Sequence, residues 1–175
     1  MTGNPDKLAE ARRLCATEIR AVEVDLPEIQ SLDIQTILRG KAEEAYRLLR
    51  QPLIVEETGL ELAVLNGFPG ALVKWMLAAV GAEGIARTAH SLGNASATAR
   101  CALLFYDGSR EVVGEGTTTG QLVLPPRGEG GFGWDPVFLP DGHNRTYAEL
   151  SGAEKDQTSH RGHAWRRLTD LLRNI

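Results

Sequence analysis

Two β-rich stretches on either side of an Asp-Gly turn place the strongest constraint on how this chain can fold. ARCALLFYDG runs from 99 to 108, and REVVGEGTTTGQLV follows from 110 to 123. An Asp-Gly pair between two stretches of this kind is typical of a β-hairpin. The sequence therefore predicts two long neighbouring strands of one sheet, and the rest of the chain must pack around that sheet.

Helical and strand patterns alternate in the remainder of the 175 residues. Apolar residues recur at helical spacing at 8–15, from about 33 to 50, around 72–80 and in the closing stretch 159–175. AVEVDL (21–26) alternates like a strand, LIVEE (53–57) resembles a buried strand, and LELAV (60–64) is a further candidate. No long repeat and no linker divides the chain. We expect a single domain over 1–175, of α/β class, with an elongated mixed β-sheet flanked by helices.

Charge and cysteine usage exclude several classes of protein. The net charge is −4 and no block of like charges occurs, which argues against a nucleic-acid-coating surface. Cys15 and Cys101 follow no metal-binding pattern and are expected to be reduced, buried thiols. The start has no apolar leader, and no apolar run reaches the length of a membrane span, so we expect a cytoplasmic protein without a membrane partner.

Several familiar catalytic motifs are missing or incomplete. There is no GxxxxGK[ST] phosphate loop and no GxSxG elbow, and GEGGFG lacks the strand-turn-helix setting of a dinucleotide fingerprint. His160 and His163 could pair on zinc, but no third ligand with a recognisable spacing accompanies them. Zinc is therefore a weak hypothesis.

The opening TGNPDK has the form of a turn that begins a helix. Asn4 is placed as the N-cap and Pro5 as the first helical residue. Free backbone N–H groups, the positive end of a helix and the ammonium of Lys7 together suit a phosphate group. An ordinary capped turn is the alternative.

Two adjacent carboxylates, Glu56 and Glu57, end the apolar run LIV, and Glu28 lies upstream. Magnesium bound to a nucleotide is held by one or two carboxylates together with phosphate oxygens and waters. The pattern is therefore compatible with a magnesium site, although solvated strand ends also carry Glu.

The glycine-rich GGFGWD (130–135) combines backbone freedom with flat side chains. Its glycines would let the backbone approach a ligand closely, while Phe132 or Trp134 offers a face for a base. A tight loop around a core aromatic is an equally good interpretation.

Taken together, these segments resemble one known family. TGNPDKLAE, VDLPEIQ, LIVEETGLELAVLNGFPGALVKWML, GEGGFGWDPVFLPDGHNRTYAEL and AEKDQTSHRGHA follow one another in the order, and nearly at the spacing, of the inosine triphosphate pyrophosphatase or Ham1-like family. The resemblance covers nearly the whole chain. It implies hydrolysis of ITP, dITP and XTP to the monophosphate and pyrophosphate, with Mg²⁺ as cofactor, by a homodimer of elongated α/β fold.

The resemblance also assigns a role to individual residues. Glu28 and Glu57 would bind the metal, and Glu57 would help to activate water as the catalytic residue. Phe132 would stack on the purine, and Lys155, His160 and Arg161 would reach the oxygen-bearing edge of the base. The other implied substrate contacts are Thr2, Gly3, Asn4, Lys7, Lys41, Thr58 and Lys74 toward the phosphates, with Gly133, Trp134 and Asp135 shaping the base pocket.

This assignment would explain selectivity among purines. Hypoxanthine and xanthine present an acceptor at position 6, where adenine presents an amino donor. A site built to donate hydrogen bonds to that position can reject the mismatched base by on the order of 10⁴, because buried polar groups are left unpaired.

Two departures from the family pattern leave alternatives open. The family has a hydrophobic strand before TGN, whereas this chain starts at the last position of that strand, so we expect the first strand to be truncated. Glu57 stands where the family has Asp, one methylene further out. A catalytically impaired nucleotide-binding homologue, or a pyrophosphatase with another nucleotide substrate, are therefore the alternatives to the enzyme proposed by resemblance.

Overall fold

The structure, a computed structural model, describes residues 5–15, 19–27 and 29–174. Of the helices within these ranges, none is both long and apolar enough to cross a membrane. The elements are α1 (Pro5–Leu14), α2 (Ile34–Leu49), β1 (Leu53–Leu62), β2 (Pro69–Gly70), α3 (Val73–Ser91), β3 (Ser96–Tyr106), β4 (Glu111–Leu122), β5 (Phe138–Pro140), α4 (Gly152–Thr158) and α5 (His160–Arg173), with short 3-10 helices at Ala63–Leu65, Asp135–Val137 and Tyr147–Glu149.

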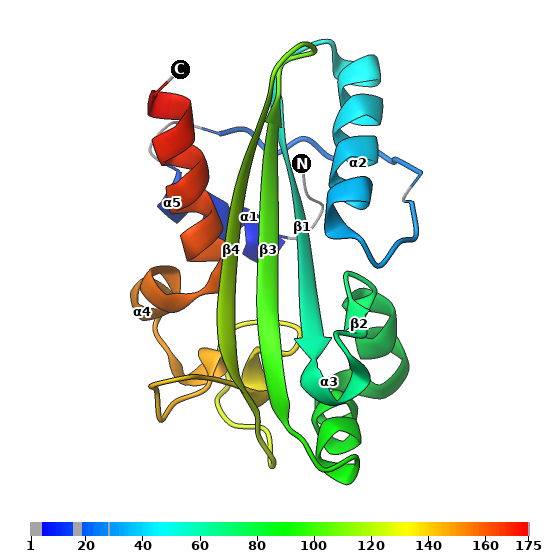
Figure 1. The fold of residues 1–175 in the computed structure, drawn as a ribbon. Coiled ribbons are helices and arrows are strands. Elements are labelled where there is room, and N and C mark those ends of the chain that lie inside the picture. Colours follow the sequence, from blue (N-terminus) through cyan, green and yellow to red (C-terminus); the bar gives the residue numbers. More distant parts are fainter. Residues whose placement is uncertain (1–4, 16–18, 28, 175) are drawn as a thin grey trace.

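The predicted hairpin forms the centre of the sheet. The strand order is β2-β1-β3-β4-β5, and every described pair is antiparallel. Strand β3 pairs with β4 along its whole length, with Leu103 opposite Gly114 near the middle. In Figure 1 they are the long ribbons that run the height of the molecule, with β1 beside them. The hairpin prediction is confirmed.

Alternation along β3 explains why helices cover both faces of the sheet. Cys101 and Leu103 point to one face and pack against α5, while Ala102 and Leu104 point to the other and pack against α2. Each face is thus closed by its own helix, and Figure 1 shows α5 and α2 on opposite sides of the strands. The expected α/β class and the helix-flanked sheet are confirmed.

A third hydrophobic cluster fills the other end of the sheet, where α3 packs. Leu60 of β1 and Ala99 of β3 meet Ile85 and Ala86 of this helix, and Trp134 closes the cluster. Helices α2 and α3 therefore belong to separate cores, which follow one another along the same strands.

Helix α2 begins and ends close to the predicted bounds of 33 and 50. The side chain of Asp33 accepts hydrogen bonds from the backbone N–H groups of Gln35 and Thr36, which are otherwise unpaired at a helix start. At the other end Arg50 adopts a left-handed conformation, with φ of 50°. The apolar stripe and the cap residue together allow this helix to be predicted from the sequence.

Two strand predictions are wrong in detail. Residues 21–26 have no regular secondary structure, although their pattern alternates. The stretch 60–64 is not a separate strand, because its first three residues continue β1 and the rest form a 3-10 turn. The expected truncation of the first strand concerns residues 1–4, which lie outside the described residues. A mixed sheet contains both parallel and antiparallel pairs, and all pairs among the described strands are antiparallel.

Glycines on β4 let α5 approach the sheet with almost no gap. A Cβ at Gly116 would lie 2.2 Å from the carbonyl oxygen of His160 and 2.4 Å from the backbone nitrogen of Ala164. At Gly114 it would lie 2.6 Å from the carbonyl oxygen of Ala164. No side chain fits at these distances, so the position of the N-terminal half of α5 depends on both glycines.

Candidate functional site

Adjacent positions on β1 send two carboxylates to opposite faces of the sheet. Glu56 lies opposite Leu103, on the face covered by α5, and Glu57 lies opposite Ala102, on the face covered by α2. One pocket of about 1120 Å³ is lined by both. A pocket that reaches both faces must run along the edge of β1 away from β3, and residues 22–26 line it from the other side.

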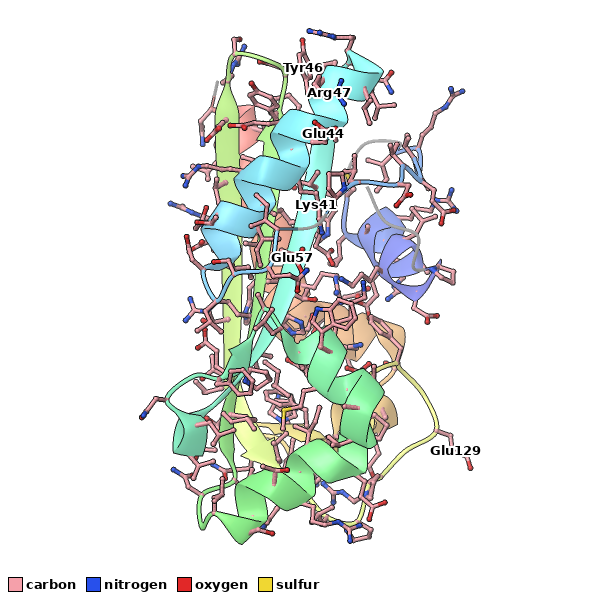
Figure 2. The ribbon with its side chains drawn as sticks, turned by 90° about the vertical axis from the view of Figure 1, so that its right-hand side faces the viewer. Lys41, Glu44, Tyr46, Arg47, Glu57 and Glu129 are labelled. Atoms are coloured by element: carbon pink, nitrogen blue, oxygen red, sulfur yellow. The ribbon has the colours of Figure 1, made fainter. Side chains whose placement is uncertain are left out.

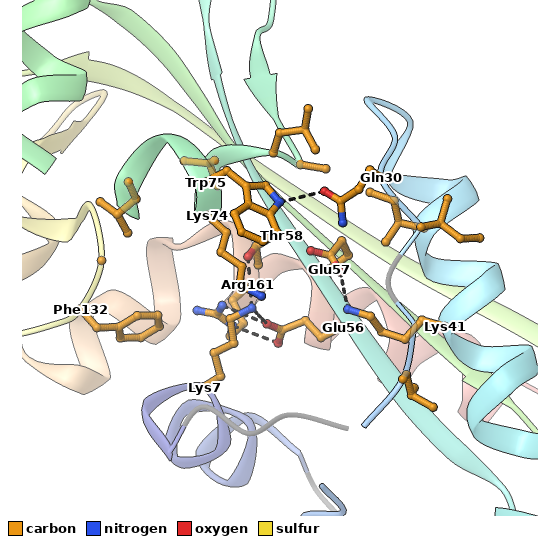
Figure 3. A pocket seen from close by; sticks show the side chains of 18 of the residues that line it. Lys7, Gln30, Lys41, Glu56, Glu57, Thr58, Lys74, Trp75, Phe132 and Arg161 are labelled. Carbon is orange, nitrogen blue, oxygen red and sulfur yellow. Dashed lines mark hydrogen bonds and ion pairs between the residues drawn. The ribbon is translucent and has the colours of Figure 1, made fainter. Parts of the chain in front are cut away.

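Glu56 is held by two cations from opposite ends of the chain. Arg161 donates from Nε and Nη2 to its two carboxylate oxygens, both at 3.0 Å, and the Nζ of Lys7 lies 3.3 Å from Oε1. Burial alone would raise the pKa of Glu56, but the charges of Arg161 and Lys7 outweigh it and lower the pKa to about 2. Figure 3 shows this cluster in the pocket.

Arg161 is a buried centre of charge, with only 2% of the residue exposed. Its Nη1 also donates to Oε2 of Glu10, from the second turn of α1. Burial acts to lower the pKa of the guanidinium, and the carboxylate of Glu56 outweighs that effect, so the pKa is raised. A bidentate contact on one carboxylate and a further contact on a second fix the orientation of this side chain.

Lys155 extends the same network toward the loop that carries Phe132 and Asp135. Its Nζ lies 2.8 Å from Oε1 of Glu10 and 2.6 Å from Oδ2 of Asp135. Asp135 also accepts a hydrogen bond from the backbone N–H of Phe132, at 2.8 Å. Burial raises the pKa of Asp135, and the charge of Lys155 opposes that rise. Negative and positive side chains thus alternate along one continuous network, in the order Asp135, Lys155, Glu10, Arg161, Glu56 and Lys7.

The Phe132 ring lies against the cations of this network. The Nζ of Lys155 is 4.7 Å from the ring centroid, and the guanidinium carbon of Arg161 is 5.5 Å from it. Both distances are within the range of cation–π attraction. The half-buried ring lines the pocket, together with Gly133, Trp134 and Asp135 from the same loop.

His160 lies under the same loop as a buried, stacked imidazole. Its ring centroid is 5.3 Å from that of Trp134 and 6.0 Å from that of Tyr147. Burial, and then the positive charge of Arg161, hold its pKa well below the ordinary value. The imidazole is therefore neutral at physiological pH, and its Nδ1 finds no hydrogen-bond partner within the described chain.

On the opposite face of the sheet, Glu57 pairs with α2. The Nζ of Lys41 lies 2.6 Å from Oε2 of Glu57, and both side chains are about 15% exposed (15% and 16%). Figure 2 shows the two pointing toward each other, whereas Glu44 and Arg47 lie further along the helix. Lys74, at the start of α3, lines the same pocket.

Most of the site residues expected from the sequence are brought together in this pocket. Thr58 accepts a hydrogen bond from Lys7 at 3.3 Å. Lys155 contacts the loop 130–135, which lines the pocket, by binding Asp135 and by lying over the ring of Phe132. Four expected residues, Thr2, Gly3, Asn4 and Glu28, lie outside the described residues. The pocket is lined by Lys7, Lys41, Glu57, Thr58, Lys74, Phe132, Gly133, Trp134, Asp135, His160 and Arg161.

No ready-made metal cluster is found in the part of the chain that the structure describes. Among these residues, no group of three or more His, Cys, Asp or Glu side chains could hold a metal ion. His163 directs Nδ1 to the carbonyl of Thr117, at 3.0 Å, while His160 stacks beneath Trp134. This arrangement gives the zinc hypothesis no support.

Sequence reasoning assigned no role to Glu10 and placed Glu56 beside Glu57 in the carboxylate pair of a possible magnesium site. Glu10 is 6% exposed although it lies on a helix that begins at the surface. One signal was present: Glu10 follows Lys7 by three residues, so both lie on the same side of α1. Trp75 and Gln30 also line the pocket, and the sequence analysis had not placed them there.

Acid should weaken the fold through Glu56. Its folded-state pKa of about 2 lies below the ordinary value of 4.5, so its contribution is fully present above about pH 4.5 and lost as the pH falls toward 2. A shift of this size corresponds to about 3 kcal/mol in the free energy of unfolding. Urea unfolding at a series of pH values between 2 and 7 measures it.

Glu56→Gln is the control for this prediction, because an amide does not titrate. The variant should be less stable than the parent at pH 7 and should lose less stability on acidification. If parent and variant lose the same free energy between pH 4.5 and 2, then Glu56 is not the group responsible.

Comparison with known proteins gives one consistent family. A sequence model described as the Ham1 family matches residues 1–171. The chain is 38% identical over 176 residues to the inosine triphosphate pyrophosphatase of Schizosaccharomyces pombe, covering 98% of this chain and 93% of that protein. It is 37% identical over 177 residues to the dITP/XTP pyrophosphatase of Methanopyrus kandleri, covering 99% and 94%.

A solved structure agrees with these sequence relatives. The fold is similar to that of a HAM1 protein from Coxiella burnetii, with a TM-score of 0.85 and 27% identity. The similarity covers 99% of this chain and 96% of that one. The described helices and the long hairpin are therefore part of a shared architecture.

Proposed function

The chain belongs to the Ham1 family, and we propose that it is a nucleoside triphosphate pyrophosphohydrolase. It converts deaminated purine nucleotides, namely ITP, dITP and XTP, to the monophosphate and pyrophosphate. One observation carries the proposal: a single pocket has lysines and a carboxylate at one end and an aromatic ring with buried cations at the other. This arrangement suits a triphosphate and a base, respectively.

At the phosphate end, Lys7, Lys41 and Lys74 reach the pocket from three different helices. Their ammonium groups neutralise the charge of a triphosphate from several directions. The predicted phosphate turn at Thr2, Gly3 and Asn4 precedes the helix that carries Lys7 and remains a prediction. Binding of this kind orients the anhydride bond for attack.

Glu57 is the proposed catalytic carboxylate. It accepts a proton from the attacking water, while Lys41 fixes the carboxylate position through the 2.6 Å contact. The water oxygen bonds to a phosphorus of the triphosphate, and the anhydride bond between the nucleotide and pyrophosphate breaks. Glu56 is a poorer candidate because both of its oxygens are occupied by Arg161.

Mg²⁺ is proposed as the cofactor, because the donors fit this ion. A carboxylate oxygen of Glu57 and phosphate oxygens are the ligand types that magnesium prefers, and Glu28 is the second predicted ligand. When bound, the ion would neutralise phosphate charge and polarise the reacting oxygens. Glu57 lines the same pocket as the lysines proposed to hold the phosphates, so an ion bound to Glu57 would lie within reach of phosphate oxygens.

At the base end, we propose that Arg161, Lys155 and His160 set selectivity. Three of the five N–H donors of Arg161 are used by Glu10 and Glu56, and the remaining two are available to an acceptor on the base. Phe132 provides the stacking face. Adenine, with its amino group at position 6, would leave such donors unpaired.

Release of pyrophosphate from a panel of triphosphates tests the proposed function. With Mg²⁺ present, we expect kcat/KM for ITP, dITP and XTP to exceed that for ATP by on the order of 10⁴. Calorimetric binding of the same nucleotides provides the second measurement. Tight ITP binding without turnover would instead favour the impaired nucleotide-binding homologue, and turnover of another nucleotide would favour a different substrate.

A cytoplasmic homodimer completes the proposal. Phe68, which precedes α3, and Val80, which lies within it, are 46% and 49% exposed and offer apolar surface to a second copy of the chain. The cytoplasm follows from the substrate class, because nucleoside triphosphates are intracellular metabolites. Sedimentation at micromolar concentration that gives only a 19.0 kDa species would contradict the dimer.

A further inference from the structure

A large aromatic side chain lies at the phosphate end of the pocket and is linked to the opposite wall. Trp75 is 55% exposed, and its Nε1 donates a hydrogen bond to Oε1 of Gln30 at 2.8 Å. The Nζ of Lys74 lies 5.4 Å from the centroid of the Trp75 ring. Figure 3 shows Gln30, Trp75 and Lys74 around the carboxylates of the pocket.

We propose that Trp75 is a positioning residue for phosphate binding, held in place by Gln30 and acting through Lys74. The hydrogen bond fixes the plane of the indole ring, and the ring attracts the ammonium group of Lys74. A lysine side chain otherwise loses considerable rotamer freedom when it binds a ligand. A ring that restricts this side chain beforehand lowers that entropic cost.

The hydrogen bond joins two parts of the chain that are anchored separately. Gln30 follows Ile29, whose side chain fills the space beside Gly40 of α2, where a Cβ would lie 2.4 Å from Ile29 Cδ1. Three residues after Gln30, Asp33 caps the same helix. Gln30 is thus tied to α2, while Trp75 lies in the first turn of α3.

The spacing of the two helices matters because each carries a phosphate-binding lysine. Lys41 comes from α2 and Lys74 from α3, and the helices pack in different hydrophobic clusters. A triphosphate that contacts both ammonium groups needs them at a fixed separation. The Gln30–Trp75 bond joins the two walls at the pocket itself and so favours that separation.

This inference rests on the proposed function, and its test uses inorganic tripolyphosphate, which has no base and needs no turnover. The variants are Gln30→Ala, Trp75→Phe, which keeps a ring without the N–H donor, and Lys74→Ala. Gln51→Ala is the matched control, because Gln51 is an exposed glutamine beyond the end of α2. Calorimetry measures tripolyphosphate binding, and steady-state kinetics measures kcat and KM for ITP.

We expect Gln30→Ala and Trp75→Phe each to weaken tripolyphosphate binding and raise the KM for ITP by about 3- to 10-fold, the effect of one lost hydrogen bond. The kcat should stay within about twofold, since binding rather than the transition state is affected. The double variant should match either single variant. In the Lys74→Ala background, Gln30→Ala should have no further effect.

Several results would overturn the proposal. They are parental binding in Gln30→Ala, an equal loss in Gln51→Ala, or an undiminished effect of Gln30→Ala when Lys74 is absent. Failure of the parent to bind tripolyphosphate would also overturn it. If the parent binds tripolyphosphate but does not hydrolyse ITP, the proposed function fails, and the role of Trp75 is still decided by the binding data.

Discussion

Glu57→Ala is expected to lower kcat for ITP by about 10²- to 10⁴-fold, the range for loss of a general base. The carboxylate is proposed to receive the proton of the attacking water and to bind the metal, and both interactions are strongest in the transition state. Nucleotide binding should remain measurable, because Lys7, Lys41 and Lys74 still line the pocket. Pyrophosphate release and calorimetry measure the two quantities.

Two control variants make this prediction specific. Glu57→Gln keeps the shape of the side chain and removes its charge, so its kcat should fall nearly as far. Glu61 lies on the same strand and the same face as Glu57, and its carboxylate pairs with Arg100 at 2.8 Å. The kcat of Glu61→Ala should stay within about twofold of the parent value. If Glu57→Ala kept the parental kcat, Glu57 would be excluded as the general base, and Glu56 would become the better candidate.

Arg161→Ala is expected to destabilise the fold by about 3–5 kcal/mol, the cost of breaking a buried ion pair. Glu10 and Glu56 would each lose a buried partner, and both side chains are less than 10% exposed (8% and 9%). From the sequence alone, a variant at this position is expected to change base selectivity more than stability. Because Arg161 lies in a buried network of ion pairs, we expect its loss to affect stability more than selectivity. Urea unfolding measures the decrease in the free energy of unfolding.

Arg167→Ala is the matched control, because Arg167 lies on the same helix and is exposed. Its stability should be within about 0.5 kcal/mol of the parent. In whatever fraction of Arg161→Ala remains folded, the ratio of kcat/KM for ITP over ATP should also fall. A variant as stable as the Arg167→Ala control would show that the ion pairs contribute little to folding.

The main elements of the fold could be predicted because their signals are local. The Asp-Gly turn gives the hairpin, and the apolar stripe with Asp33 as its cap gives α2. The alternation of residues 21–26 was misleading, because a strand also requires a hydrogen-bonded neighbour and no sequence pattern reports one. β1 continues past residue 59 because it pairs with β3 as far as Leu62, and Gly59 allows the close approach of Gly70; both are tertiary contacts.

Many of the residues that line the pocket could be named from the sequence, but their contacts could not. Arg161 and Glu56 are 105 positions apart, and only the folded chain brings them within 3.0 Å. Glu10 escaped notice because an amphipathic helix is recognised by its apolar residues, and a buried charge does not follow that pattern. The resemblance predicts that Lys155 contacts the base, and the structure shows its ammonium group held by two carboxylates, those of Glu10 and Asp135.

The glycines beneath α5 limit which positions of this chain can be varied in laboratory evolution. A substitution of Phe132 changes a half-buried side chain that lines the pocket. A side chain at Gly116 would instead push away the end of α5 that presents His160 and Arg161. Libraries that aim to change the proposed base preference should randomise the loop and leave Gly114 and Gly116 intact, because at these two positions α5 packs directly on the backbone of β4.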